Sequence, residues 1–135
     1  VRIFASGHGG PASMTLERPI ENWGNLHQLS DEKLVEATRT FGVLPKDLSS
    51  ELLRALLPAL RSDFQVYETY RPVSRPSPLK LPITALGGDE DPAVPTSHLS
   101  TWQLETGHSM AAPKVFRGGH FYLQERVEEV SGSFI

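Results

Sequence analysis

A chain of 135 residues has the size of a single domain. Hydrophobic residues make up 39% of it and charged residues 21%, and its net charge of −3 is too small to favour nucleic acid or a membrane surface as a partner. The sequence contains no cysteine, which excludes disulfides and thiolate zinc sites and favours a cytoplasmic location. No apolar run reaches the roughly 18 residues that cross a membrane, so neither a membrane nor a nucleic acid is expected as a partner.

The first part of the chain predicts a short strand and then a helix. Residues 1–5 are apolar and precede a run of glycine and proline, which is typical of a strand that ends in a loop. Residues 11–28 show no periodicity and are predicted as loop. A helix over residues 31–41 begins after Ser30, whose hydroxyl can accept a first-turn N–H, and ends at Gly42, which suits a positive φ.

A second helix is predicted over residues 50–70, because its leucines form one broad apolar stripe. Such a stripe is more often a buried core or lid face than a surface for a partner helix. Pro58 lacks an N–H and is expected to kink or interrupt this helix. Residues 71–80 contain three prolines and are predicted to be irregular. The stripe consists of Leu52, Leu53, Leu56, Leu57 and Leu60.

The last part of the chain alternates between strands and helices. Strands are predicted over residues 81–86 and 114–116, and helices over residues 96–107 and 121–130. Alternation of this kind predicts the α/β fold class, with parallel strands joined by right-handed crossover helices.

Two loops follow predicted strands and carry groups that can do chemistry. Residues 87–95 contain Asp89, Glu90 and Asp91, and residues 116–121 contain His120. Taken singly, the acidic run is typical of a solvated turn and the histidine of an ordinary loop residue. In open parallel sheets, however, functional groups gather beyond the carboxyl ends of the strands. A carboxylate and an imidazole that meet there form an acid–base pair.

Together with other segments, these two loops resemble the C-terminal half of type II thioesterases. These are α/β-hydrolases that act on acyl groups held by acyl- or peptidyl-carrier proteins. The resemblance covers nearly the whole chain. Its matching segments are residues 2–7, 29–32, 57–64, 68–70, 87–95, Trp102 and residues 115–123.

The resemblance implies a role for each part of the chain. Asp91, which stands directly before Pro92, would be the acid of a catalytic triad, and His120 would be its base. Residues 1–135 would form part of one thioesterase domain, and residues 11–80 would be a helical lid over the acyl pocket.

The third member of that triad is missing from the expected place. In α/β-hydrolases the order is Ser, Asp or Glu, then His, with the serine in a Gly-x-Ser-x-Gly turn between a strand and a helix. No such turn precedes Asp91. The chain is therefore expected to be a C-terminal portion of the enzyme that is inactive without an upstream serine and folds poorly by itself.

Two segments imitate family motifs without their context. Ser109 lies in the run Gly-His-Ser-Met-Ala, but it follows a predicted helix, precedes a strand and comes after Asp91. We therefore interpret it as a loop serine. Residues 7–10 read Gly-His-Gly-Gly and are interpreted as a flexible entrance rather than an oxyanion hole. The five histidines include no His-x-x-x-His pair, and no phosphate-binding loop precedes a helix, so neither a metal nor a cofactor is expected.

The function that this resemblance implies is hydrolysis of thioesters on phosphopantetheinylated carrier proteins, in the synthesis of polyketides, nonribosomal peptides or fatty acids. Two alternatives stay open. One is an α/β-hydrolase that cleaves other esters with the same Asp91 and His120. The other is a truncated, non-catalytic chain that only docks a carrier protein.

Overall fold

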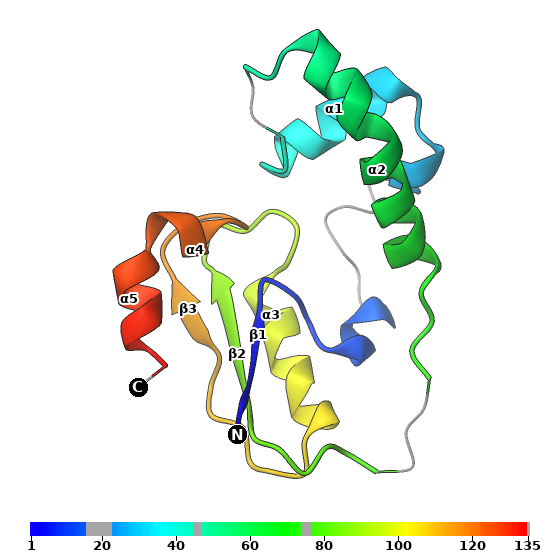
Figure 1. The fold of residues 1–135 in the computed structure, drawn as a ribbon. Coiled ribbons are helices and arrows are strands. Elements are labelled where there is room, and N and C mark those ends of the chain that lie inside the picture. Colours follow the sequence, from blue (N-terminus) through cyan, green and yellow to red (C-terminus); the bar gives the residue numbers. More distant parts are fainter. Residues whose placement is uncertain (16–22, 45–46, 74–76, 135) are drawn as a thin grey trace. The chain divides into compact units, whose positions relative to one another are not determined.

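The computed structural model describes residues 1–15, 23–44, 47–73 and 77–134 (Figure 1). It divides into two compact units. One consists of Val1–Pro19 and Pro72–Ile135, and the other of Ile20–Arg71.

The first unit is built on three parallel strands. They are β1 (Ile3–Ser6), β2 (Ile83–Gly88) and β3 (Lys114–Phe116), in the spatial order β1-β2-β3. The connection from β2 to β3 contains α3 (Thr96–Leu99) and the 3₁₀ helix η4 (Ser100–Glu105). Parallel neighbours require crossover connections of this kind, so the predicted parallel sheet with intervening helices is confirmed.

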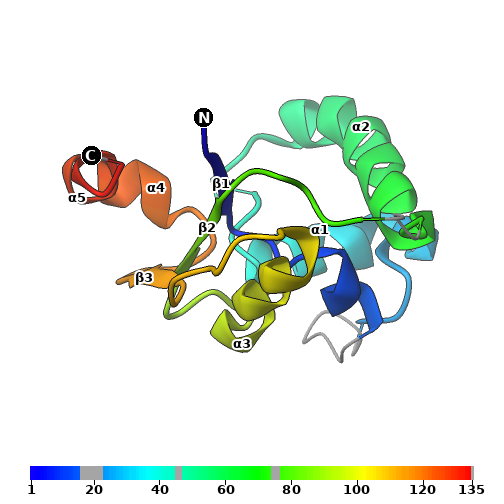
Figure 2. The same cartoon turned by 90° about the horizontal axis from the view of Figure 1, so that it is seen from below.

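Helices cover both faces of this sheet (Figure 2). On one face, Leu99 of α3 packs so closely on Gly87 that a Cβ at residue 87 would lie 2.6 Å from a Leu99 methyl carbon. On the other face lie α4 (Tyr122–Glu125) and α5 (Val127–Gly132). A buried cluster holds these helices to the strands. It consists of Leu86, Phe116, Tyr122 and Val130.

The second unit is helical. It contains the 3₁₀ helix η3 (Leu26–Gln28), α1 (Asp31–Thr40) and α2 (Ser50–Thr69). The start of α1 is as predicted, because the Ser30 hydroxyl accepts the N–H of Lys33 at 3.4 Å. Its end is also as predicted, since Gly42 has a φ of +73°.

Two long side chains of α2 tie it to η3 and the start of α1. The Glu68 carboxylate accepts the N–H of Leu26 at 2.6 Å and that of His27 at 3.2 Å, and it also pairs with the His27 ring. The guanidinium of Arg61 donates to the carbonyl oxygens of His27 and Leu29, each at 2.7 Å, and to Asp31 at 2.6 Å. Backbone N–H groups at the start of the 3₁₀ helix and carbonyl groups toward its end thereby find partners on α2.

The strand predicted over residues 81–86 lies two residues later, at Ile83–Gly88, and the helix predicted over 96–107 is the pair α3 and η4. Three larger details also differ from the sequence-based expectations. Pro58 does not interrupt α2, which continues from Ser50 to Thr69, because a proline removes one hydrogen bond from a helix whose other bonds remain. The expected interruption is therefore wrong, and the alternative, a kink, stays a prediction. The predicted helix over 121–130 is two short helices, separated at Arg126, where ψ turns to 35°.

The third difference lies in the region predicted as loop. Residues 11–28 contain the short 3₁₀ helices η1 (Pro11–Thr15) and η3. Single 3₁₀ turns are too brief to produce a periodic pattern in sequence. Residues 16–22 of that prediction lie outside the described residues.

Replacement of Glu68 tests the link between α2 and η3. We predict that Glu68→Ala lowers the free energy of unfolding by about 2 kcal/mol, because two backbone N–H groups lose their acceptor, and urea unfolding measures the loss. Asp63→Ala, at an exposed position of the same helix, is the matched control and should change stability little. Equal losses of unfolding free energy in the two variants would contradict the role of Glu68 as the link between α2 and η3.

Candidate active site

The loops that follow β2 and β3 lie side by side at the carboxyl edge of the sheet. The N–H of Asp89 donates to the carbonyl of Phe116 at 2.9 Å, and the N–H of Glu90 donates to that of Gly118 at 3.0 Å. The Asp89 carboxylate accepts the N–H of Gly118 at 2.9 Å. Asp89 therefore joins the two loops, rather than being part of a purely solvated turn.

A glycine at the end of β2 makes this close approach possible. A Cβ on Gly88 would lie 2.3 Å from the carbonyl oxygen of Gly118 and 2.5 Å from that of Gly119. Any side chain would collide with backbone atoms there, so a glycine is required for the loops to meet.

This arrangement brings together the two predicted site residues. Oδ2 of Asp91 lies 2.8 Å from Nδ1 of His120. The Asp91 side chain is 1% exposed and that of His120 is 30% exposed, so the carboxylate is buried while the imidazole reaches the surface. The other carboxylate oxygen accepts the N–H groups of Ala93 and Val94 at 2.8 and 3.1 Å. Three hydrogen bonds thus compensate the burial of this charge.

The hydrogen bond to Asp91 raises the pKa of His120 above its ordinary value, and it outweighs the opposing effect of burial. A carboxylate only accepts, so Nδ1 carries the proton and Nε2 is left as the basic nitrogen. Such a pair can take a proton from a nearby nucleophile and hold the resulting charge.

Ser109, whose surroundings in the sequence imitate a nucleophile motif, does not lie beside the Asp91–His120 pair. Ser109 is exposed, in the loop that precedes β3, whereas His120 follows the carboxyl end of that strand. Gln103 holds this loop, since its side chain accepts the N–H of Met110 at 2.7 Å and donates to the carbonyl of His108 at 2.9 Å. The structure does not bring Ser109 to the Asp91–His120 pair.

The glycine-rich segment after β1 is held by hydrogen bonds. The carbonyl of His8 accepts the indole N–H of Trp102 at 2.7 Å, and the N–H of Gly10 donates to the hydroxyl of Thr101 at 2.8 Å. Gly9 and Gly10 are buried. Two residues of η4 thus hold this segment by hydrogen bonds, while its interpretation as a flexible entrance stays a prediction.

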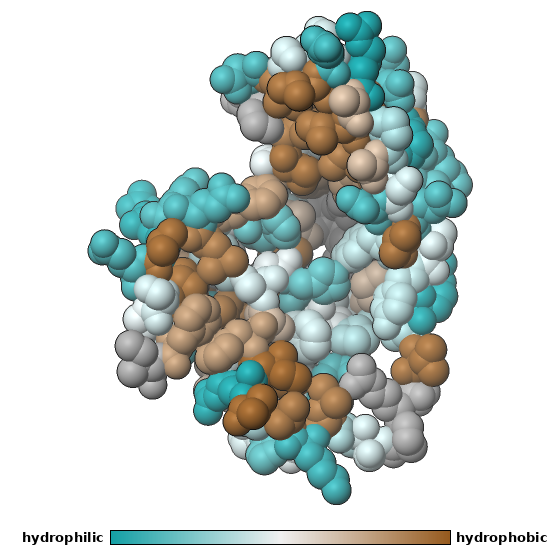
Figure 3. All heavy atoms as spheres, viewed as in Figure 1, coloured by the Kyte–Doolittle hydropathy of each residue, from teal (hydrophilic) through white to brown (hydrophobic). Residues whose placement is uncertain are grey.

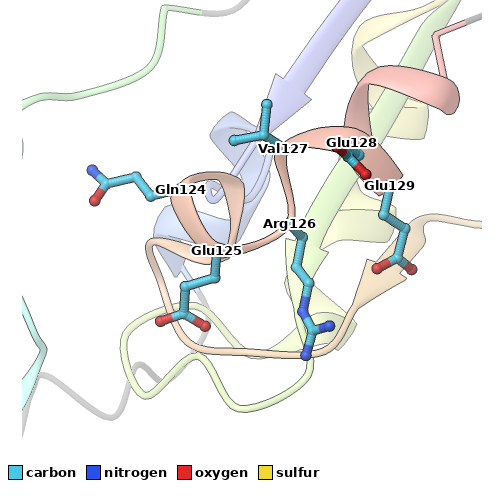
Figure 4. A pocket seen from close by; sticks show the side chains of 6 residues that line it. All are labelled: Gln124, Glu125, Arg126, Val127, Glu128 and Glu129. Carbon is cyan, nitrogen blue, oxygen red and sulfur yellow. The ribbon is translucent and has the colours of Figure 1, made fainter.

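A cavity of about 360 Å³ lies at the junction of α4 and α5, apart from the acid–base pair (Figure 4). Its lining comes from one continuous stretch, and Figure 4 shows these side chains spreading in different directions instead of converging on one point. It offers no set of groups aimed at a ligand. The lining residues are Gln124, Glu125, Arg126, Val127, Glu128 and Glu129.

Two other kinds of feature are absent from the described parts of the chain. Within residues 1–15, 23–44, 47–73 and 77–134, no three His, Asp or Glu side chains gather in a way that could hold a metal ion. None of the helices described there is both long and apolar enough to span a membrane.

Comparison with known proteins connects this geometry to one family. A family model described as "Thioesterase domain" matches residues 16–134. The Streptomyces venezuelae protein "Thioesterase PikA5" is 37% identical over 131 residues, which cover 95% of this chain and 43% of that protein.

Solved structures give the same result. The type II thioesterase BorB from the borrelidin biosynthetic cluster has a TM-score of 0.78 and 34% identity, and the match covers 97% of this chain and 51% of BorB. ClbQ from the colibactin NRPS/PKS pathway has a TM-score of 0.81 and 27% identity, with 97% and 53% covered. The chain thus spans about half the length of these proteins, and the predicted fold, part of an α/β-hydrolase, is confirmed.

One part of the site was not indicated by the sequence. Gly7 lies against the His120 ring, and the neighbouring Ser6 bonds to Tyr122. No spacing rule joins residues that are 116 positions apart. The only sign in the sequence is that a strand predicted to end near residue 5 is followed by serine and glycine.

The titration of His120 tests the acid–base pair. We predict a midpoint above the ordinary histidine value of about 6.5 and a lower midpoint in Asp91→Asn. That variant removes the negative charge that stabilises the imidazolium, and its amide oxygen stays with the N–H groups of Ala93 and Val94, so that its N–H₂ faces Nδ1. Because the pKa of His120 is raised in the folded protein, its contact with Asp91 contributes fully to the free energy of unfolding below about pH 6.5. That contribution is lost as the pH rises through the pKa that His120 has in the folded protein. Proton NMR of the ring measures both midpoints.

Asp89→Asn is the matched control for that titration. Its amide oxygen can still accept the N–H of Gly118, and the Asp89 carboxylate has no recorded contact with the His120 ring. The control should keep the His120 midpoint of the unchanged protein. The pairing would be contradicted if Asp91→Asn left the midpoint unchanged as well.

Proposed function

This chain belongs to the thioesterase family, and from that premise we propose that it supplies the acid and base of an enzyme that hydrolyses acyl thioesters on carrier proteins. The observation that supports the proposal is the 2.8 Å contact between the buried Asp91 carboxylate and Nδ1 of the partly exposed His120. The substrate is an acyl group held as a thioester on the phosphopantetheine arm of an acyl- or peptidyl-carrier protein.

The proposed mechanism uses the two nitrogens of His120 for different tasks. Nδ1–H stays bonded to Asp91, which fixes the tautomer and stabilises the imidazolium. Nε2 takes the proton of a serine hydroxyl as the serine oxygen attacks the thioester carbonyl. When the C–S bond breaks, Nε2 returns that proton to the departing sulfur, and the acyl group remains on the serine. Water, activated by the same nitrogen, then releases the acid.

The nucleophile is proposed to come from outside these 135 residues, as the triad order of α/β-hydrolases requires. We call residues 1–135 together with that serine-bearing segment the complete enzyme. Residues 1–135 by themselves are then inactive, because Ser109 is exposed in the loop before β3 and does not reach His120.

The region of residues 11–80 is proposed to be the lid that receives the acyl chain. It contains the helical unit Ile20–Arg71. Within that unit, helix α2 presents Leu52 and Leu56 at 53% and 40% exposure. Apolar surface of this kind on a helix is favourable for contact with an acyl chain.

The setting is proposed from the names of relatives. PikA5 is called a thioesterase, and ClbQ comes from an NRPS/PKS pathway. An enzyme of this type would remove acyl groups from carrier proteins during polyketide or nonribosomal peptide synthesis. Its site is proposed to need no cofactor, since serine, histidine and aspartate suffice for the chemistry.

Removal of the His120 imidazole tests the proposed function. In the complete enzyme, His120→Ala should lower kcat for an acyl-carrier thioester at least about a thousandfold, because the base and the acid of both steps are lost. The rate of thiol release from a defined acyl-carrier protein gives kcat.

The matched controls lie in the Ser109 loop, where His108→Ala and Ser109→Ala should leave kcat unchanged. A near-normal rate for His120→Ala would exclude the mechanism, and loss of activity or of fluorophosphonate labelling in Ser109→Ala would place the nucleophile at Ser109. Preference for free short esters over carrier thioesters would indicate an esterase of the same fold. Carrier binding without any hydrolysis would indicate a docking protein.

A further inference from the structure

The hydroxyl of Tyr122 forms a contact that packing alone does not require. The side chain is completely buried, and its ring stacks on Phe116 with the ring centres 5.4 Å apart and the planes 8° from parallel. Its hydroxyl lies 2.7 Å from Oγ of Ser6 at the end of β1. Phenylalanine would keep the stacking and nearly all of the volume, so the hydroxyl adds only this bond.

The chain next to Ser6 forms a wall of the site. Gly7 has a φ of +61°, and a Cβ placed on it would lie 3.5 Å from Cε1 and 3.8 Å from Nδ1 of His120. The backbone therefore passes directly behind the imidazole, at the residue that follows the last residue of β1. Any shift of the end of β1 would change the space available to the ring.

His120 is held from both sides along its own loop. On its N-terminal side, Gly118 is bonded to Asp89 of the loop after β2. On its C-terminal side, Tyr122 donates its N–H to the carbonyl of Gly119 at 3.1 Å and reaches β1 through its hydroxyl. The two anchors belong to different strands, and His120 lies between them.

We propose that Tyr122 is a positioning residue for His120: through its hydroxyl bond to Ser6 it sets the distance between Gly7 and the imidazole, and so holds the ring against Asp91. This inference rests on the proposed function for its effect on rate. The geometric part of the proposal does not depend on that function, because it concerns only the position of the His120 ring in the absence of substrate.

The electrostatic surroundings of the hydroxyl agree with this assignment. Burial raises the pKa of Tyr122, the bond to Ser6 opposes that shift, and the negative charge of Asp91 adds to it. A tyrosine with a raised pKa also stays protonated at neutral pH, and can keep its bond to Ser6.

The test removes each end of the bond in the complete enzyme. Tyr122→Phe and Ser6→Ala should each lower kcat about fivefold, the effect of one ordinary hydrogen bond, with KM unchanged. The double variant should fall no further than either single one, because both remove the same bond. In each variant the ¹H–¹³C resonance of His120 Cε1, the ring atom nearest to Gly7, should also shift.

Ser131→Ala is the matched control, since it removes an exposed hydroxyl that donates to the carbonyl of Glu128 at 3.0 Å. It should change neither kcat nor the Cε1 resonance. If Tyr122→Phe fails to fold, Ser6→Ala by itself tests the positioning role of Tyr122. Ser6 is exposed, so its replacement by alanine should leave the fold intact.

The proposal is overturned if the Cε1 resonance stays in place, if kcat is unchanged, or if the effects of the two variants add. Should the complete enzyme hydrolyse no thioester, the proposed function fails, and the Cε1 resonance by itself still decides the positioning role of Tyr122.

Discussion

The hydrogen bond between the buried Asp91 carboxylate and the imidazole of His120 is the interaction on which the proposed chemistry depends. A carboxylate that is 1% exposed is tolerated because its two oxygens accept from Ala93, Val94 and His120. The same bond fixes the proton on Nδ1 and leaves Nε2 free for a nucleophile. Without it, His120 would be one more partly exposed histidine.

The rest of the first unit serves to bring these two side chains together. Parallel strands place the loops after β2 and β3 at one edge of the sheet, and Gly88 lets the loops approach to a distance that no other residue allows. The buried cluster packs β2 and β3 against α4 and α5. Figure 3 shows brown apolar side chains over α4 and α5 at the surface as well. Among the described residues, Leu123 and Val127 are 39% and 61% exposed, which fits a chain that spans about half the length of its relatives.

Much of this could be predicted from the sequence, and the failures have physical causes. The β3 bounds and the caps of α1 follow from local rules, because Ser30 and Gly42 act through their own backbone surroundings. The meeting of Asp91 and His120 followed from strand order and from a family resemblance. The Ser6–Tyr122 bond did not, since only the folded sheet brings β1 to α4. The break at Arg126 was missed because no glycine or proline marks it in the sequence. The continuity of α2 through Pro58 was missed because the loss of one hydrogen bond does not end a helix of 20 residues.

The tautomer of His120 tests the central claim most directly. In the complete enzyme, at a pH above the pKa of His120, ¹⁵N NMR of the ring distinguishes a protonated nitrogen from a bare one. We predict a proton on Nδ1, bonded to Asp91, and an unprotonated Nε2. A proton on Nε2, with Nδ1 bare, would contradict this prediction, because Oδ2 of Asp91 would then lose its donor on His120 and Nε2 would have no lone pair to accept the proton of a nucleophile.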